Sequence, residues 1–199
     1  MKNSTSMLHR IKPRLAVASS GLAAGLISSL AISGLILLAE KVAQLPVGTF
    51  YLVLASAVLQ NQSHSVDAIA LGLFLHLVAG SIIGLVISAP FCASARLFAS
   101  ASRYGPAYGL VAGFLLWLVL FLPITFGLIL PLLNMVDGQV IRQQAPTGQE
   151  SVIATTELLS IIDKVIAGSL AFNVFFGLLV MIIMVALSRT FMRSNQVII

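Results

Sequence analysis

The sequence carries very little charge. Asp, Glu, Lys and Arg together make up 9% of the 199 residues, 59% of the residues are hydrophobic, and the mean hydropathy is +1.07. Soluble domains are typically about 25% charged, so this composition excludes an ordinary soluble domain. About 20 consecutive apolar residues are enough for a helix to cross a bilayer. The composition therefore indicates an integral membrane protein with the lipid bilayer as its first partner.

Cysteine and catalytic motifs are scarce too. Cys92 is the single cysteine, which excludes an internal disulfide and a multi-cysteine metal site. The sequence also lacks a Gly-x-Ser-x-Gly elbow, a His-Glu-x-x-His zinc motif and a phosphate-binding loop. We therefore expect no catalytic residues, no metal site and no cofactor, and we do not expect an enzyme.

Charges of opposite sign are separated along the chain. The acidic residues fall in two segments: Glu40, Asp67, Asp137, Glu150, Glu157 and Asp163. Of the eleven Lys and Arg residues, eight lie in the N-terminal tail, a middle connection and the C-terminal end, and three lie beside the acids. Because Lys and Arg are enriched in cytoplasmic segments, this split predicts a multi-pass protein of the cell (inner) membrane with both termini in the cytoplasm. The net charge of +5 is spread over span ends rather than clustered, so we do not expect nucleic acid as a partner.

Four long apolar stretches lie between the charged zones. They predict an all-α polytopic membrane protein with spans at about residues 15–38, 66–91, 106–130 and 162–187. The domain organisation expected is a cytoplasmic basic tail (1–14), a four-helix transmembrane domain (15–189) and a cytoplasmic tail (190–199). The first apolar run, 15–39, is longer than the roughly 7–15 residues of a signal peptide, so we interpret it as a retained span.

Two further segments and one proline shape this outline. Residues 46–61 are apolar but cover only roughly 22 Å as a helix, short of the ~30 Å bilayer core. They predict a short re-entrant or interfacial helix on the outer side. The polar stretch 134–156 is expected as an outer loop, with a short helix starting near Thr155 or Thr156. Pro123 is expected to kink the third span.

Two halves of the chain share a pattern of small residues. Gly-Leu-x-Ala-Gly occurs at 21–25 and again at 109–113, and the pair His76 and Gly80 is matched by Asn173 and Gly177. The offsets, 88 and 97 residues, differ by an amount that an insertion in the outer loop would absorb. This predicts two tandem helical-hairpin repeats, 15–91 and 106–189, in parallel orientation. Chance similarity between glycine-rich helices is the alternative.

Glycines at every fourth position form the clearest motif. They lie along one face of each helix and let two backbones approach closely. The predicted packing residues are Gly21, Gly25, Gly80, Gly84, Gly105, Gly109 and Gly113. Packing within one chain and packing between two copies are both open.

His76 is the most informative polar residue, because it lies roughly 13 Å along the helix from Asp67 and therefore near the bilayer middle. Ionisable groups at that depth are costly and face the bundle interior or water. One interpretation is a polar site formed by His76, Asn173, Ser28 and Ser29. The other is a neutral histidine bonded between helices.

These residues carry a family resemblance. The Gly-Leu-x-Ala-Gly opening of the first span, His76 with Gly80 and Gly84, and the glycine-rich restart at Gly109 followed by Trp117 resemble YagU-like inner-membrane proteins and related uncharacterised four-span families. The likeness covers about residues 15–187. It implies a four-span fold and no particular activity. Such families often carry a histidine in the final span, where this chain has Asn173.

Three functions remain open on the sequence. The first is a structural or accessory subunit that packs with itself or with a larger membrane complex. The second is a small permease or channel that uses His76, Asn173 and the kink at Pro123. The third, an intramembrane enzyme, lacks the convergent polar groups that such chemistry needs.

Overall fold

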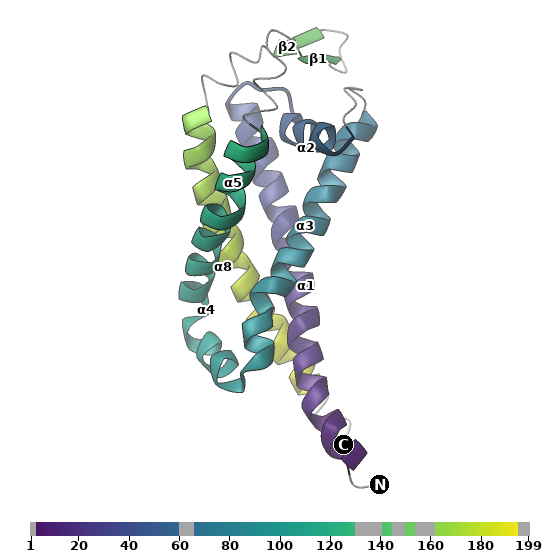
Figure 1. The fold of residues 1–199 in the computed structure, drawn as a ribbon, viewed down its shortest axis with the longest axis vertical. Coiled ribbons are helices and arrows are strands. Elements are labelled where there is room, and N and C mark those ends of the chain that lie inside the picture. Colours follow the sequence, from purple (N-terminus) through teal and green to yellow (C-terminus); the bar gives the residue numbers. More distant parts are fainter. Residues whose placement is uncertain (1–2, 60–65, 130–140, 145–149, 154–161, 195–199) are drawn as a thin grey trace. The chain divides into compact units, whose positions relative to one another are not determined.

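The computed structural model describes residues 3–59, 66–129, 141–144, 150–153 and 162–194. Its elements, shown in Figure 1, follow in chain order: α1 (Asn3–Val42), α2 (Thr49–Leu59), α3 (Val66–Ala93), α4 (Ala95–Leu116), η1 (Trp117–Phe121), α5 (Leu122–Ile124), η2 (Thr125–Ile129), β1 (Ile141–Gln144), β2 (Glu150–Ile153) and α8 (Ile162–Ser194).

Within these residues, four helical stretches are long and apolar enough to cross a membrane. They are Arg14–Val42, Val66–Ala93, Ala95–Gly127 and Ile166–Phe191. The prediction of four long apolar helices is therefore confirmed. α1 begins at Asn3 and α8 ends at Ser194, so both end helices continue into the segments predicted as tails. α3 also passes Pro90, where span two was expected to end, and reaches Ala93.

The chain divides into two compact units. Unit 1 comprises residues 1–30, 77–114 and 174–199, and unit 2 comprises residues 31–76 and 115–173. α1, α3, α4 and α8 each contribute to both units.

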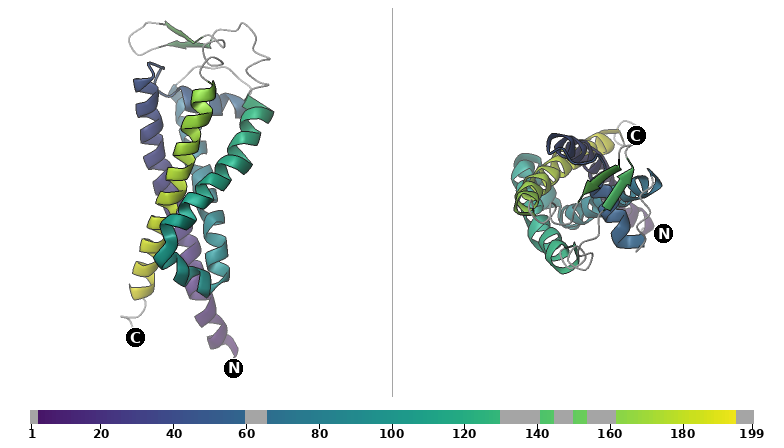
Figure 2. Two further views of the ribbon diagram at one scale, coloured as in Figure 1. Left: turned by 90° about the vertical axis from the view of Figure 1, so that its left-hand side faces the viewer. Right: turned by 90° about the horizontal axis from the view of Figure 1, so that it is seen from above.

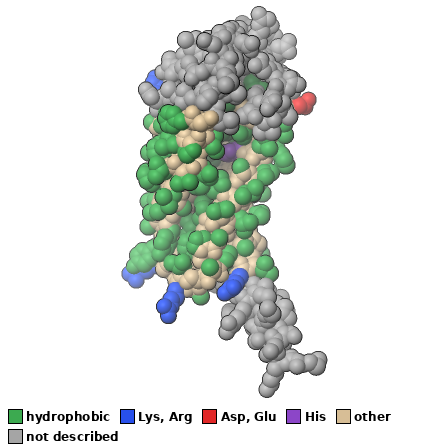
Figure 3. Space-filling view, in the orientation of Figure 1, with side chains coloured by type: hydrophobic (Ala, Val, Ile, Leu, Met, Phe, Trp, Pro, Cys, Tyr) green, Lys and Arg blue, Asp and Glu red, His purple; other side chains and the backbone are tan. Residues whose placement is uncertain are grey.

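In unit 1, the parts of α1 and α3 lie against each other, and so do the parts of α4 and α8 (Figure 2). The buried residues at these helix faces are mostly small, and Val180, Met181 and Met184 of α8 supply the larger buried side chains. Hydrophobic side chains cover the face shown in Figure 3, and basic side chains lie at one end of unit 1. The exposed basic residues of this unit include Arg14, Arg96, Arg103 and Arg189.

In unit 2, α2 packs against the first part of α3. Leu52 and Ala55 of α2 form a small apolar core with Ala68 of α3. The turn before α2 has positive φ at Gln44 (58°) and Gly48 (94°). A short helix was predicted after span one, and α2 confirms that a helix is present there.

The third apolar stretch is interrupted twice. At Tyr104 the backbone leaves helical geometry (φ −113°, ψ 16°), two residues before Pro106. Ala95–Arg103 is therefore a separate short helix within the predicted connection, although the whole stretch Ala95–Gly127 is long and apolar enough to cross a membrane. Pro123 lies in α5, between the π-helical segments η1 and η2. The missing amide of Pro123 is accommodated by a change of hydrogen-bonding pattern around it.

The stretch that was predicted as an outer loop contains a two-stranded sheet. β1 and β2 pair antiparallel, with Ile141 opposite Ile153 and Gln144 opposite Glu150. The loop prediction is therefore wrong for residues 141–144 and 150–153. The short helix expected near Thr155 or Thr156 lies outside the described residues.

Candidate functional site

His76 lies half-buried in α3, against two aromatic rings of α2. Its ring is 5.7 Å from the ring of Phe50, at 89°, and 5.9 Å from the ring of Tyr51, at 66°. Both contacts are edge-to-face, an arrangement that aromatic rings favour. His76, which was predicted to lie deep in the membrane, is thus packed against α2. The sequence did not predict this contact.

Gly72 explains how α2 comes so close to His76. A Cβ at Gly72 would collide with the backbone of Tyr51, lying 2.6 Å from its carbonyl carbon and 2.8 Å from its Cα. Gly72 is one helical turn before His76, so the missing side chain lets α2 rest on α3 at the height where its rings reach the imidazole. The spacing of four that links His76 to Gly80 and Gly84 could have revealed Gly72, because it continues the same row.

Glu40 fixes the N-terminal end of α2, the same end that lies against Gly72 and His76. Its carboxylate accepts hydrogen bonds from the amides of Gly48 and Phe50, each at 2.7 Å, and the residue is 6% exposed. Amides at a helix N-terminus have no partner within the helix, and a carboxylate satisfies them with charge-assisted bonds. The acid expected to mark the outer side of the membrane therefore acts as a buried cap.

Tyr51 and Ser33 add two buried hydroxyls beside this cap. Tyr51 is 1% exposed and Ser33 is 3% exposed. Burial raises the pKa of the Tyr51 phenol above its ordinary value near 10, the Ser33 hydroxyl lowers this pKa in part, and the charge of Glu40 adds to the rise. Within the described residues, neither hydroxyl has a hydrogen bond of good geometry, so the two are close without being aligned. We refer to Ser33, Glu40, Tyr51 and His76 as the α2 cluster.

Asn173, predicted to face His76, is bonded within its own helix. Its side-chain amide donates to the carbonyl of Ser169 at 2.8 Å. The Ser169 hydroxyl donates to the carbonyl of Ile166 at 2.7 Å and accepts from the indole N–H of Trp117 at 3.1 Å. The polar groups of this part of α8 therefore serve helix packing, with Trp117 as a further participant.

Ser28 and Ser29 belong to unit 1, whereas His76 and Asn173 belong to unit 2. Ser29 donates its hydroxyl to the carbonyl of Gly25 at 2.8 Å. Ser28 is completely buried. The four residues of the predicted polar site are therefore divided between the two units.

The glycines of α1 and α3 meet backbone to backbone. A Cβ at Gly84 would collide with the carbonyl oxygen of Gly21 and lie 2.6 Å from the Cα of Gly25. A Cβ at Gly25 would collide with the carbonyl oxygen of Gly80 and lie 2.9 Å from the Cα of Gly84. Any side chain at these positions would force the two helices apart.

The contact between α4 and α8 has the same form. A Cβ at Gly177 would collide with the carbonyl oxygen of Gly109 and lie 2.6 Å from the amide nitrogen of Gly113. A Cβ at Gly109 would lie 2.7 Å from the Cα of Leu178. Gly105, predicted with this group, has space for a methyl group, with Val185 3.9 Å away.

The surroundings of Gly84 and Gly177 correspond atom by atom. Gly84 meets the first and second glycines of the 21–25 motif, and Gly177 meets the first and second glycines of the 109–113 motif. The sequence comparison instead matched Gly177 with Gly80. An alignment of the two halves on these contacts would instead place Gly177 with Gly84 and Ser169 with His76.

No group of three or more His, Cys, Asp or Glu residues that could hold a metal ion is present in the described part of the chain. Comparison with protein-family models, with curated proteins and with solved structures finds no match to this chain. The likeness to YagU-like families stays a prediction from the sequence.

Proposed function

We propose that this chain is a structural or accessory subunit of the cell (inner) membrane, with both termini in the cytoplasm. It would be built from two tandem helical hairpins, α1 with α3 and α4 with α8, and it would pack with itself or with a larger membrane complex. The observation that carries the proposal is the pair of matching glycine contacts, at Gly84 and at Gly177.

Glycine contacts suit such a role because the hydrophobic effect does not drive helices together within lipid. Close backbone approach supplies the van der Waals contact that replaces it. The polar side chains near these contacts are used within the fold: Ser29 bonds to Gly25, and Trp117 bonds to Ser169. A rigid frame with an apolar exterior, rather than a polar route, is what these residues support.

The test is purification from membranes in a mild detergent, followed by native mass spectrometry. We expect either a discrete homo-oligomer or a stoichiometric complex with a larger membrane protein. A strictly monomeric chain at membrane-like concentrations, with no co-purifying protein, would contradict the accessory role.

Topology can be tested separately, because Cys92 is the only native cysteine. Replacing Cys92 by Ser and placing single cysteines near residue 2 and near residue 198 allows labelling of each tail from either side. We expect both tails to be labelled only after the membrane is permeabilised. Labelling of one tail from outside would reject the proposed orientation.

The α2 cluster favours a second candidate, a small permease or channel. Its buried hydroxyls lie beside His76 and Glu40 and could serve a polar solute or a proton. Reconstituted vesicles would distinguish the two: a flux of protons or small solutes that is abolished by His76→Ala, with normal insertion of the variant, would favour the permease.

A further inference from the structure

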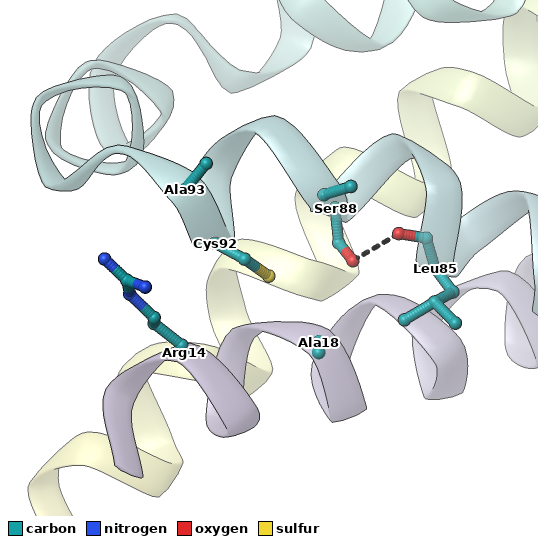
Figure 4. A pocket seen from close by; sticks show the side chains of 7 residues that line it. Arg14, Ala18, Leu85, Ser88, Cys92 and Ala93 are labelled. Atoms are coloured by element: carbon teal, nitrogen blue, oxygen red, sulfur yellow. Dashed lines mark hydrogen bonds between the residues drawn. The ribbon is translucent and has the colours of Figure 1, made fainter. Parts of the chain in front are cut away.

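A small hollow lies between α1 and α3 within unit 1 (Figure 4). Its volume is about 360 Å³, and its lining includes Arg14, Ala18, Leu85, Ser88, Ala89 and Cys92. The Ser88 hydroxyl already donates to the carbonyl of Leu85 at 2.7 Å. The hollow therefore presents an apolar wall, and Arg14 lies at its edge.

The hollow follows from how the two helices cross. α1 and α3 touch at Gly21 and Gly84, and a Cβ at Gly21 would already collide with Ser88. Beyond this point the facing side chains are small, Ala18 on one helix and Ala89 on the other, so they leave the space between the helices unfilled. The same glycines that bring the helices together thus produce a groove beside their crossing point.

Arg14 has no acidic neighbour to pair with in its own unit. The residues of unit 1 include eight Lys and Arg residues and not a single Asp or Glu. Arg14 is exposed. No Asp or Glu of this unit can therefore pair with Arg14. A guanidinium is well suited to phosphate because it can donate two parallel hydrogen bonds.

We propose that this groove binds an anionic phospholipid, whose phosphate pairs with Arg14 and whose acyl chain lies along Ala18, Leu85 and Ala89. Free phosphate would use the arginine but not the apolar wall, whereas a lipid uses both. Binding of this lipid rests on the proposed orientation, which puts Arg14 at the cytoplasmic leaflet. Cytoplasmic leaflets are rich in anionic lipids, and basic pockets between transmembrane helices bind their head groups.

A second groove of the same character supports the assignment independently. It lies between α4 and α8, also in unit 1, with a volume of about 280 Å³. Gly105, Pro106, Met181 and Val185 contribute to its wall, and Arg189 lies at its edge. Arg189 also donates to the carbonyl of Ser102 at 3.2 Å, so we expect this groove to bind lipid more weakly than the one at Arg14.

The test uses the full chain in detergent and native mass spectrometry with added phosphatidylglycerol or phosphatidylcholine. The wild type should retain phosphatidylglycerol in preference to phosphatidylcholine. Arg14→Gln should weaken phosphatidylglycerol binding by roughly tenfold, the scale of one lost charge-assisted contact. Arg103→Gln is the matched control, because Arg103 is exposed in the same unit and lies over the Tyr104 ring at 5.4 Å. It should leave binding unchanged.

A second variant tests the apolar wall without altering charge. Ala89→Leu should fill the groove and weaken phosphatidylglycerol binding although Arg14 is intact. Equal losses of phosphatidylglycerol binding in Arg14→Gln and Arg103→Gln would show that only surface charge matters and would overturn the proposal. An Ala89→Leu protein that binds phosphatidylglycerol normally would overturn it too. Full displacement of the lipid by millimolar inorganic phosphate would also overturn it. None of these results depends on whether the chain joins a complex.

Discussion

Gly25→Ala tests whether the glycine crossing holds α1 and α3 together. The added methyl group would meet three backbone atoms of α3: the carbonyl oxygen and carbonyl carbon of Gly80 and the Cα of Gly84. Backbone cannot turn aside as a flexible side chain can. Ordinary contacts lie at 3.4–4 Å, and the carbonyl oxygen of Gly80 is the closest of the three atoms, so the helices would have to separate by about 1 Å or more.

The energetic cost can be bounded from two sides. Overpacking a tight contact typically costs about 1–3 kcal/mol. The same substitution at Gly34, nine residues further along α1, meets nothing within 4 Å. There, alanine should only gain helix propensity, roughly 0.5–1 kcal/mol. Because that gain is common to both variants, they should differ by the overpacking cost of about 1–3 kcal/mol, which for a chain of this size is roughly 2–12 °C in melting temperature.

The assay is heating in detergent at one fixed rate, followed by size exclusion to measure the folded fraction. A fixed rate matters because irreversible unfolding makes the apparent melting temperature depend on the rate. α8 offers an equivalent pair: Gly177→Ala should destabilise the protein, and Gly168→Ala, where nothing lies within 4 Å, should not. If Gly25→Ala and Gly34→Ala have the same melting temperature, the close backbone contact does not contribute to stability, and the glycine crossing does not hold α1 and α3 together.

Three other variants address neighbouring features. Gly80→Ala should lower the melting temperature because the new methyl group meets Ser29. Adding Ser29→Gly should restore most of the loss. A double variant with the same melting temperature as Gly80→Ala would exclude this contact as the cause. Glu40→Ala leaves two amides at the start of α2 without their acceptor. This should lower the free energy of unfolding by about 1–3 kcal/mol and increase proteolysis within residues 43–48. Unchanged proteolysis would argue against the cap. Burial raises the Tyr51 pKa, so the stability that the neutral phenol contributes is complete below about pH 10 and is lost as pH rises through the raised pKa. Tyr51→Phe should therefore lose less stability than the wild type between about pH 9 and pH 11. Parallel curves of stability against pH for the two proteins would contradict a buried phenol.

The sequence was enough for the four long helices, because apolar runs of this length have few other ways to fold. The sequence also placed a helix boundary at Pro106, two residues after the break in helical geometry at Tyr104. It did not predict the α2 cluster. Glu40 looked like a surface charge, and its burial depends on α2 folding back so that two amides meet its carboxylate.

Two other differences have identifiable causes. Polar composition hid the hairpin of β1 and β2, although Pro146 and Gly148 between the strands are ordinary turn residues. The predicted repeat matched Gly177 with Gly80, which lies four residues from Gly84 on the same face of the helix. Spacing alone does not decide which of them corresponds to Gly177, whereas the contacts pair Gly177 with Gly84.

The change of winding around Pro123 has a consequence for any substitution in this helix. Each residue of a π turn rotates the chain by less than an α residue does. η1 lies before α5 and Thr125, so the residues after η1 face a different side of the helix from the one that a constant angle predicts. Thr125 is 2% exposed, although Ile124 and Phe126 on either side of it are exposed. A helical wheel drawn with a constant angle would therefore misplace the side chains beyond Phe121.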